Sequence, residues 1–282
     1  MRAKRSLGQH FLVDPNLQRK IVAAVEPGPG DTVIEVGPGQ GALTGLLAEG
    51  AGRLVAVELD DRLAEELAAR YRAADRVVII HADILEWEPG RVLADPVVKV
   101  VGNIPYNITS PLLFRLLEWR PAPERIVVMV QREVADRILA DTGEKAYGAL
   151  TVGIRAGADV ERLFHAGRGA FRPVPNVDST VIALRPRPVE GPGTGEALRS
   201  LTRAAFGLRR KQLQKILRIA PGYGLETEAA ESVLTEVGVP PTARPETLEP
   251  GTFIELAAAL GRLGYPRGGP AGTDPGEGGP DG

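Results

Sequence analysis

Residues 103–106, with the sequence NIPY, place an amide, an apolar residue, a proline and a tyrosine directly after the apolar run VVKVVG. An amide oxygen accepts hydrogen bonds, proline fixes the backbone of a turn, and an aromatic ring offers a flat face. These residue types at the end of a strand favour a site in which an acceptor, a rigid turn and an aromatic face act together. An ordinary turn with a buried tyrosine is the alternative interpretation.

A glycine-rich segment forms a second candidate site. EVGPGQGALT places Gly37, Gly39 and Gly41 at a predicted strand-to-helix turn, where glycine lets the backbone approach a ligand and the helix N-terminus offers free N–H groups. Glu58 ends the next predicted strand, 21 residues after Gly37, close to the spacing of about 20 residues at which a carboxylate meets ribose hydroxyls. The pattern predicts a nucleoside cofactor, with capping of the helix that begins at Asp60 as the alternative role of Glu58.

The chemistry of the cofactor can be narrowed from the remaining polar residues. Asp83, in HADIL, follows the third predicted strand, where a carboxylate can accept from an adenine amino group. The chain has no cysteine and only three scattered histidines, so we expect no metal site and no thiol chemistry. A nicotinamide is the runner-up, but two carboxylates, a glycine turn and an amide fit a methyl donor better than a hydride carrier. The three histidines are His10, His81 and His165.

Strands that alternate with helices must position these residues. Between residues 30 and 130, short β-rich runs are separated by helical stretches, a pattern typical of a parallel sheet with helices on both faces. The carboxyl ends of such strands meet at one edge, so the candidate residues should line one crevice. The predicted strands are residues 32–36, 53–59, 76–80, 97–101 and 125–131, and helices should begin at Asp60 or Asp61 and at Thr109 or Ser110.

Length and composition indicate more than one domain. A chain of 282 residues with 43% apolar and 25% charged residues can form a large domain and a smaller one. The Pro/Gly-rich segment RPRPVEGPGTG near residue 186 marks the boundary. We expect a domain over 1–186, a helical domain over 187–264 and a disordered Gly/Pro-rich tail over 265–282. The absence of a long apolar run and of a signal-peptide pattern predicts a cytoplasmic protein without membrane contact.

Basic residues are segregated although the net charge is only −2. Residues 199–218 carry seven Arg or Lys and no acid, which is the distribution expected of a nucleic-acid binder. If the segment is helical, its apolar side chains form a stripe that turns most of the charge outward as a cationic ridge for phosphates. A pair of solvated helix faces is the alternative. The apolar stripe would contain Leu208, Leu213, Ile216 and Leu217.

A series of motifs resembles the ribosomal RNA adenine dimethyltransferases. In chain order these are SLGQHFLVD, EVGPGQG, VEL, ADIL, GNIPYNITSPLLF, QREVADR, KAYGALTV, FRPVPNVDS and AFGLRRKQLQKIL, over residues 4 to about 218. The later segment VGVPPTARPETLEPGTFIELAAAL is similar to the C-terminal part of the branch that acts on the small subunit, and it extends the resemblance to about residue 260.

The resemblance implies an α/β fold, with a Rossmann-like class I methyltransferase sheet and a smaller all-α C-terminal domain. It implies a monomer that uses S-adenosylmethionine to dimethylate N6 of two adjacent adenines. The adenines lie in a hairpin loop near the 3′ end of small-subunit (16S) ribosomal RNA, and the assembling 30S particle is the partner. Two alternatives stay open: a large-subunit methyltransferase that confers macrolide resistance, and a non-catalytic RNA-binding or transcription factor on the same fold. RPETL and the long helical C-terminal region favour the small-subunit enzyme.

The resemblance also assigns roles to individual residues. Asn103 Oδ1 and the Ile104 carbonyl would accept both N–H groups of an adenine N6, in a turn fixed by Pro105. The base would stack between Tyr106 and Phe171. Cofactor contacts would come from Gly37, Gly39, Glu58, Asp83, Ile84 and Asn103, with His10 and Leu12 from an N-terminal flap, where His10 could also be a polar loop residue. RNA contacts would come from Arg209, Arg210, Lys211 and Lys215.

Overall fold

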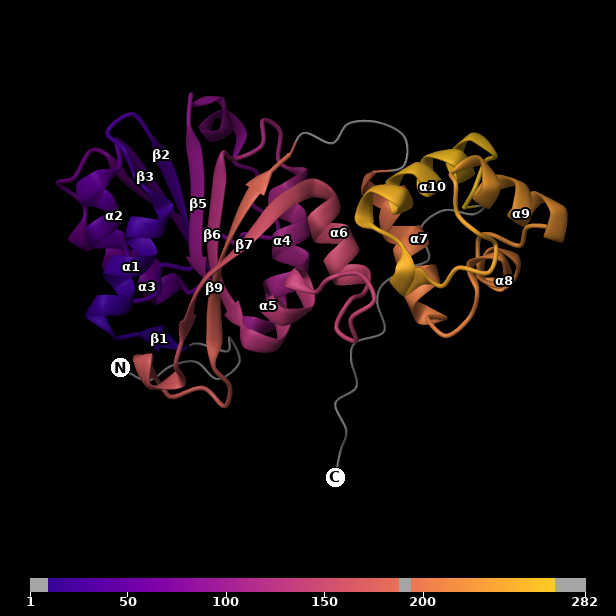
Figure 1. The fold of residues 1–282 in the computed structure, drawn as a ribbon. Helices are drawn as coiled ribbons and strands as arrows, with labels where there is room; N and C mark the ends of the chain where they lie inside the picture. Colours follow the sequence, from indigo (N-terminus) through magenta and orange to yellow (C-terminus); the bar gives the residue numbers. More distant parts are fainter. Residues whose placement is uncertain (1–9, 188–193, 267–282) are drawn as a thin grey trace. The chain divides into compact units, whose positions relative to one another are not determined.

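The chain folds into two compact units in a computed structural model that describes residues 10–187 and 194–266. The first unit covers residues 1–189 and the second covers 190–282 (Figure 1). The sequence placed this boundary at 186/187. The first nine residues of the expected flap, residues 188–193 of the linker and nearly all of the expected Gly/Pro-rich tail lie outside the described residues.

A seven-stranded sheet organises the N-terminal unit, in the order β4-β3-β2-β5-β6-β9-β7. Strands β4 to β6 are parallel, while β9 runs antiparallel to β6 and β7 antiparallel to β9. The sheet therefore has the class I methyltransferase arrangement that the sequence indicated. Its strands are β2 (Thr32–Val36), β3 (Arg53–Glu58), β4 (Val77–His81), β5 (Val98–Asn103), β6 (Arg125–Gln131), β7 (Ala158–Ala166) and β9 (Ser179–Pro186).

Continuous apolar runs explain the central strands. All five residues of β2 are buried, and Ile34 lies between Val55 of β3 and Val100 of β5 in the parallel register. Strands covered on both faces need apolar residues at every position, rather than at alternate ones. The predicted bounds of β2 and β6 are confirmed, and the other three predicted strands differ from the structure by one or two residues at their ends.

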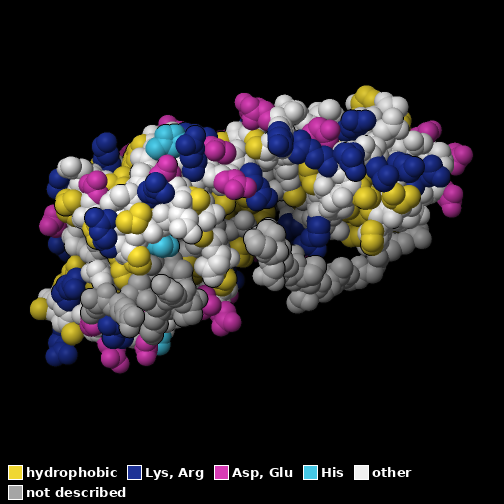
Figure 2. All heavy atoms as spheres, turned by 90° about the horizontal axis from the view of Figure 1, so that it is seen from below, with side chains coloured by type: hydrophobic (Ala, Val, Ile, Leu, Met, Phe, Trp, Pro, Cys, Tyr) yellow, Lys and Arg dark blue, Asp and Glu magenta, His cyan; other side chains and the backbone are white. Residues whose placement is uncertain are grey.

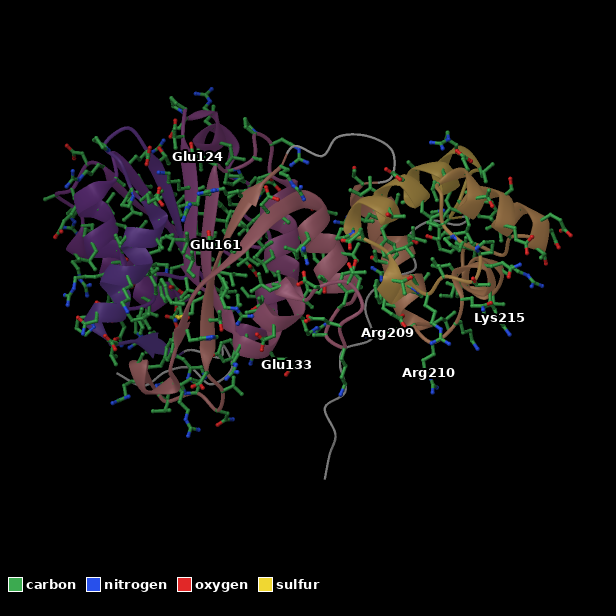
Figure 3. The ribbon with its side chains drawn as sticks, viewed as in Figure 1. Glu124, Glu133, Glu161, Arg209, Arg210 and Lys215 are labelled. Atoms are coloured by element: carbon green, nitrogen blue, oxygen red, sulfur yellow. The ribbon has the colours of Figure 1, made fainter. Side chains whose placement is uncertain are left out.

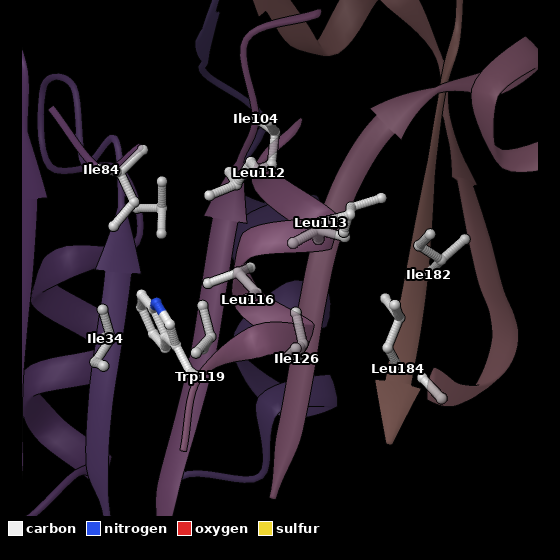
Figure 4. Close-up of a cluster of buried hydrophobic side chains, with 14 of the residues drawn as sticks. Ile34, Ile84, Ile104, Leu112, Leu113, Leu116, Trp119, Ile126, Ile182 and Leu184 are labelled. Carbon is white, nitrogen blue, oxygen red and sulfur yellow. The ribbon is translucent and has the colours of Figure 1, made fainter. Parts of the chain in front are cut away.

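Helices pack on both faces of this sheet through two apolar clusters. One cluster joins Ile34 and Val100 to Leu112 and Leu116 of α4 and to Ile154 of α6, as Figure 4 shows in part. The other cluster joins strand residues on the opposite face of the sheet, such as Val33 and Val101, to α1 and α2. The helices of this unit are α1 (Pro15–Val25), α2 (Thr44–Gly50), α3 (Asp61–Arg70), α4 (Thr109–Glu118), α5 (Arg132–Leu139) and α6 (Ala149–Gly157).

A two-stranded antiparallel sheet ties the start of the described chain to a distant segment. Strand β1 (Phe11–Leu12) pairs with β8 (Phe171–Arg172), with Leu12 opposite Phe171. This pairing was not predicted, because strands of only two residues leave no recognisable pattern in the sequence. The pairing holds residues 11 and 12 in place beside the large sheet.

The C-terminal unit is helical, as expected, but its basic segment is not one continuous helix. The segment 199–218 is interrupted at residues 208–212, where the Lys211 N–H donates to the Leu208 carbonyl in a turn. Leu213, Ile216 and Leu217 are fully buried, whereas Leu208 is only half-buried and precedes the second helix. The helices are α7 (Gly195–Gly207), α8 (Leu213–Ile219), α9 (Thr227–Glu236) and α10 (Pro250–Arg262).

The helices of residues 10–187 and 194–266 are all too short or too polar to cross a bilayer. Within the same residues, no group of three His, Cys, Asp or Glu side chains is arranged to hold a metal ion.

Candidate active site

A cavity lies at the carboxyl ends of β2, β3 and β5. The chain places β3 and β4 on one side of β2 and β5 and β6 on the other, so the strand order changes direction at β2. Such a switch point is where ligands bind in open α/β sheets. The cavity collects the predicted NIPY turn, the glycine turn, Glu58 and Asp83 in one place. Its walls are residues 10–12, 35–40, 42–43, 57–59, 82–84 and 103–108.

The glycine turn has the backbone conformation that requires glycine. Gly37, Gly39 and Gly41 have φ values of 63°, 58° and 82°, a region that side chains with a Cβ rarely adopt. A Cβ on Gly39 would also lie 3.2 Å from the Phe11 ring, and one on Gly41 would lie 2.9 Å from a Leu67 methyl group. The turn can therefore bring its backbone against a ligand only with glycine at these positions.

Glu58 is 5% exposed and accepts two backbone hydrogen bonds. Its Oε2 accepts from the Gly39 N–H and its Oε1 from the Asp60 N–H, both at 2.9 Å. Asp60 is itself the N-cap of α3, since its side chain accepts from the Leu63 N–H. The cap predicted at Asp60 or Asp61 is thus Asp60, and Glu58 fixes the glycine turn to the start of that helix. Each carboxylate oxygen keeps a second lone pair for a ligand hydroxyl.

Asp83 and Ile84 reach the cavity from the turn after β4. Asp83 is half-buried, and one of its carboxylate oxygens accepts from the Leu85 N–H at 2.8 Å. Ile84 is buried in the apolar cluster that includes α4. The Asp83 carboxylate can accept a hydrogen bond at the edge of a ligand ring, and the Ile84 side chain can pack on its face.

The NIPY turn is held by contacts to three other segments. The Asn103 Nδ2 donates to the His10 carbonyl at 3.0 Å, which leaves Oδ1 as the side chain's acceptor. The Ile104 N–H donates to the Met129 carbonyl, and the Tyr106 hydroxyl lies 3.0 Å from the Ser179 hydroxyl. Pro105 lies between them with φ −55°. The alternative of a turn with a buried tyrosine does not fit, because Tyr106 is only half-buried and lines the cavity.

His10 and Leu12 both line the cavity. The His10 ring stacks on Tyr106, with centroids 5.9 Å apart and an angle of 28° between the planes. Its Nδ1 lies 2.9 Å from the Pro173 carbonyl, so this nitrogen carries the hydrogen. His10 is therefore not simply a polar loop residue, since its ring covers the tyrosine that was expected to face the substrate base.

Phe171 does not reach the cavity. Its side chain is fully buried among apolar residues of α1 and the sheet, and it stands in β8 opposite Leu12. The expected second stacking face for a base is thus absent in this arrangement. The reason is the pairing of β1 with β8, which turns the ring into the core.

Glu35 is a cavity residue that the sequence reasoning missed. It lies in the middle of the apolar strand β2, is 2% exposed, and its Oε2 has no hydrogen-bond partner among the described residues. Burial raises the pKa of Glu35 to about 8, the Thr44 hydroxyl lowers it in part, and the Glu58 carboxylate adds to the rise. The available signal was an acid in TVIEV, a strand predicted to be buried on both faces.

The predicted RNA-binding residues lie in the C-terminal unit, where Lys and Arg side chains form a row in Figure 2. Arg210, Lys211 and Lys215 are exposed, and Figure 3 shows Arg209, Arg210 and Lys215 on the same side of the unit. Arg209 differs from the others, because it is half-buried and pairs with Glu246 at 3.8 Å. The segment thus offers exposed cations in the turn and on α8, and one cation that is already paired.

Comparison with known proteins extends across both units. The family model for ribosomal RNA adenine dimethylase matches residues 1–249. The ribosomal RNA small subunit methyltransferase A of Geobacter metallireducens is 42% identical over 269 residues, which are 94% of this chain and 98% of that protein. A dimethyladenosine transferase from Plasmodium falciparum has a TM-score of 0.78 at 25% identity over 91% of this chain and 99% of that one. The 23S rRNA methyltransferase ErmE has a TM-score of 0.65 at 30% identity over 89% and 99%.

Proposed function

The chain belongs to the ribosomal RNA adenine dimethylase family, and from this membership we propose that it dimethylates N6 of two adjacent adenines of small-subunit ribosomal RNA. The adenines are those of the 3′-terminal hairpin loop, in an assembling 30S particle. The observation that carries the proposal is that a single cavity is lined by the glycine turn with Glu58 and Asp83 and by Asn103 and Tyr106. A nucleoside donor and a nucleobase acceptor can meet there.

The cavity residues fit S-adenosylmethionine. This cofactor has an adenine, two ribose hydroxyls and an amino acid part with a cationic amino group, and when bound it supplies a methyl group on a positively charged sulfur. Asp83 and Ile84 would hold its adenine, Glu58 its ribose, and the backbone at Gly37 its amino acid part. Glu35 Oε2 is a buried acceptor without a hydrogen-bond partner among the described residues, and a donor group of the cofactor would satisfy it.

The NIPY residues would prepare the adenine N6 for attack. The lone pair of this nitrogen is delocalised into the ring, so N6 is a poor nucleophile. Hydrogen bonds from its two N–H groups to Asn103 Oδ1 and the Ile104 carbonyl favour the pyramidal geometry in which the lone pair is free. Tyr106 would support the base, and His10, which now covers its ring, would have to move aside or share that face. Alignment carries most of the catalysis, so no general base is required.

The exposed cations of the C-terminal unit would bind phosphates on either side of the target loop. Arg210, Lys211 and Lys215 are accessible for this role, whereas Arg209 first has to leave Glu246. Such contacts position RNA without reading its sequence. We also propose that the protein acts as a monomer in the cytoplasm, where ribosomes assemble.

Mapping of methylated adenines tests the substrate. Purified protein, radiolabelled S-adenosylmethionine and unmethylated 30S or 50S particles should give two dimethylated, adjacent adenines in the 30S RNA alone. Label in one 50S adenine would favour the alternative suggested by the similarity to ErmE. No label in either particle, from protein that binds the cofactor, would favour the non-catalytic alternative.

A further inference from the structure

Glu35 has a buried acceptor atom and no charge partner. No ion pair to Glu35 is formed within the described part of the chain, and its Oε2 accepts no hydrogen bond there. The residues beside it in the sheet, Ala56 of β3 and Val101 of β5, are apolar and fully buried. A carboxylate in such surroundings lacks solvent and has only the Thr44 hydroxyl beside it as a donor, so burial prevails and the neutral acid is the more stable form.

The surrounding titratable groups do not supply a cation. Lys99 on β5 is bound to Asp31 and to the Glu26 carbonyl, and Arg70 at the end of α3 donates to the Gln40 carbonyl. Burial raises the pKa of Glu35 to about 8, so the free protein at neutral pH carries a proton there. The other titratable groups facing Glu35 or lining its cavity are Glu58 of β3, Tyr71 after α3, His10, Asp83 and Tyr106.

We propose that Glu35 exchanges its proton for the cofactor: the carboxyl group is neutral in the free protein and becomes a carboxylate when the α-ammonium group of S-adenosylmethionine binds beside it. The O–H bond of Glu35 breaks, the proton passes to solvent, and the carboxylate accepts a hydrogen bond from the ammonium. This inference rests on the proposed cofactor.

The ammonium group is the part of the cofactor that satisfies Glu35. Glu35 stands two residues before Gly37, the turn expected at the amino acid end. An orphaned acceptor needs a hydrogen-bond donor, and an ammonium has three N–H groups. A sulfonium is equally positive but has no hydrogen to donate, and ribose hydroxyls donate but carry no charge that would displace a proton.

Calorimetry in buffers of different ionisation enthalpy counts the released proton. Titrations at pH 6 to 7 with S-adenosylmethionine, S-adenosylhomocysteine and methylthioadenosine separate the three parts of the cofactor. The range ends at pH 7 because α-amino groups themselves titrate near 7.7–8.0. We expect nearly one proton released with the first two ligands, none with methylthioadenosine, and nearly tenfold tighter binding of the first two at pH 7 than at pH 6.

Three variants assign the proton to Glu35. Glu35→Gln should bind S-adenosylhomocysteine with no release and no dependence on pH. Glu49→Gln removes a carboxylate from the exposed side of the neighbouring helix α2 and should behave as the wild type. His10→Gln should also keep the release, which excludes the imidazole in the cavity as its source.

Several results would overturn the inference. Unchanged release in Glu35→Gln, release with methylthioadenosine, or release with S-adenosylmethionine alone would each assign the proton elsewhere. If Glu35→Gln does not fold, the infrared absorption of a protonated carboxyl group in the wild type should disappear when S-adenosylhomocysteine is added, and its absence before addition counts against the inference. Binding without any proton release contradicts this inference only, whereas no binding at all contradicts the proposed function.

Discussion

The cavity of the N-terminal unit and the basic segment of the C-terminal unit use charge in opposite ways. In the cavity, Glu35 and Glu58 are 2% and 5% exposed. Both Glu58 carboxylate oxygens accept backbone N–H groups, whereas Glu35 Oε2 has no hydrogen-bond partner among the described residues. On α8 and the turn before it, Lys211 and its neighbours are exposed to solvent. Water screens the second group and not the first. Loss of a single polar atom in the cavity should therefore have a large effect on activity. Loss of one cation of the basic segment should have a small effect on RNA affinity, because several exposed cations contribute together.

The largest effect of a single substitution is expected at Asn103 in the cavity. Asn103→Ala removes the acceptor that orients the adenine amine, so we expect methyl transfer to fall about 100-fold to 1,000-fold, or roughly 2.7 to 4 kcal/mol by analogy with oxyanion donors. Cofactor affinity, measured by calorimetry, should stay within a few-fold. Asn16→Ala, which removes an exposed amide on α1 outside the cavity, is the control and should keep most activity. Transfer by Asn103→Ala above about a tenth of wild type would contradict the assigned role.

The pH dependence of stability tests the burial of Glu35. Because the folded pKa of Glu35 is raised from 4.5 to about 8, its contribution to stability is full below the unfolded value and is lost as pH rises to 8. Between pH 6 and 8 the free energy of unfolding should fall by about 1.4 kcal/mol per pH unit relative to Glu35→Gln. Denaturant unfolding of the two proteins measures this. Parallel curves would mean that Glu35 is already ionised at pH 6.

A change of the Glu58 side chain should affect both cofactor binding and stability. Glu58→Gln keeps the size but replaces one acceptor oxygen with an NH₂ group facing the Gly39 or Asp60 N–H. We expect cofactor binding to weaken by about 1.5 to 3 kcal/mol, with a lower melting temperature because the glycine turn loses a contact. Calorimetry and thermal unfolding report the two effects. Unchanged affinity with a lower melting temperature would leave Glu58 only its structural role.

On the exposed side, Lys211→Ala should weaken RNA binding by a modest and predictable amount. One phosphate contact contributes a slope of about 0.9 in the logarithm of affinity against the logarithm of salt concentration. Losing that contact should lower RNA affinity at 0.1 M salt by about eightfold, relative to a 1 M reference. Filter binding across a salt series measures both quantities. A slope identical to that of the wild type would show that Lys211 belongs to an ordinary solvated face.

The smallest effect should come from Arg209. Its pair with Glu246 is half-buried and 3.8 Å long, so Arg209→Ala should reduce stability by about 0 to 1 kcal/mol and change the salt slope less than Lys211→Ala does. The same filter-binding and denaturant experiments measure both. A larger change of slope for Arg209 than for Lys211 would reverse the distinction between paired and exposed cations.

The sequence was most informative where one physical requirement dominates. Strand β2 was predicted with its observed bounds because a parallel strand covered on both faces has to be apolar throughout. Strand β7 was not predicted, since its sequence ADVERLFHA mixes charged and apolar residues on a half-covered edge of the sheet. The break at residues 208–212 was also missed. Residues 199–218 are mostly helix-forming around one glycine, so their sequence predicts one helix. The break depends on the packing of Leu213, which the local sequence does not show.

The candidate site was predictable only in part for a related reason. Glycines and acids at strand ends identify Gly37, Glu58 and Asp83, because their positions in the topology follow from the strands. The contact of Asn103 with His10 depends on a segment 93 residues away, and the burial of Phe171 depends on its pairing with Leu12. Local patterns contain no information about such distant partners. Glu35 was not predicted as a site residue because it lies within an apolar strand and not at a strand end.

The pairing of β1 with β8 also fixes when the cavity can be completed during folding. His10 and Pro173 touch across 163 residues of chain, and contacts of such large sequence separation form late because loop closure costs entropy before it is rewarded. A nascent chain can build β2 to β6 while residues 10 to 12 are still unattached. The contacts with β8 and Pro173 that hold residues 10 to 12 beside Asn103 can form only after residue 173 has been translated. The enzyme's cavity would thus stay open at one wall until most of the N-terminal unit has left the ribosome.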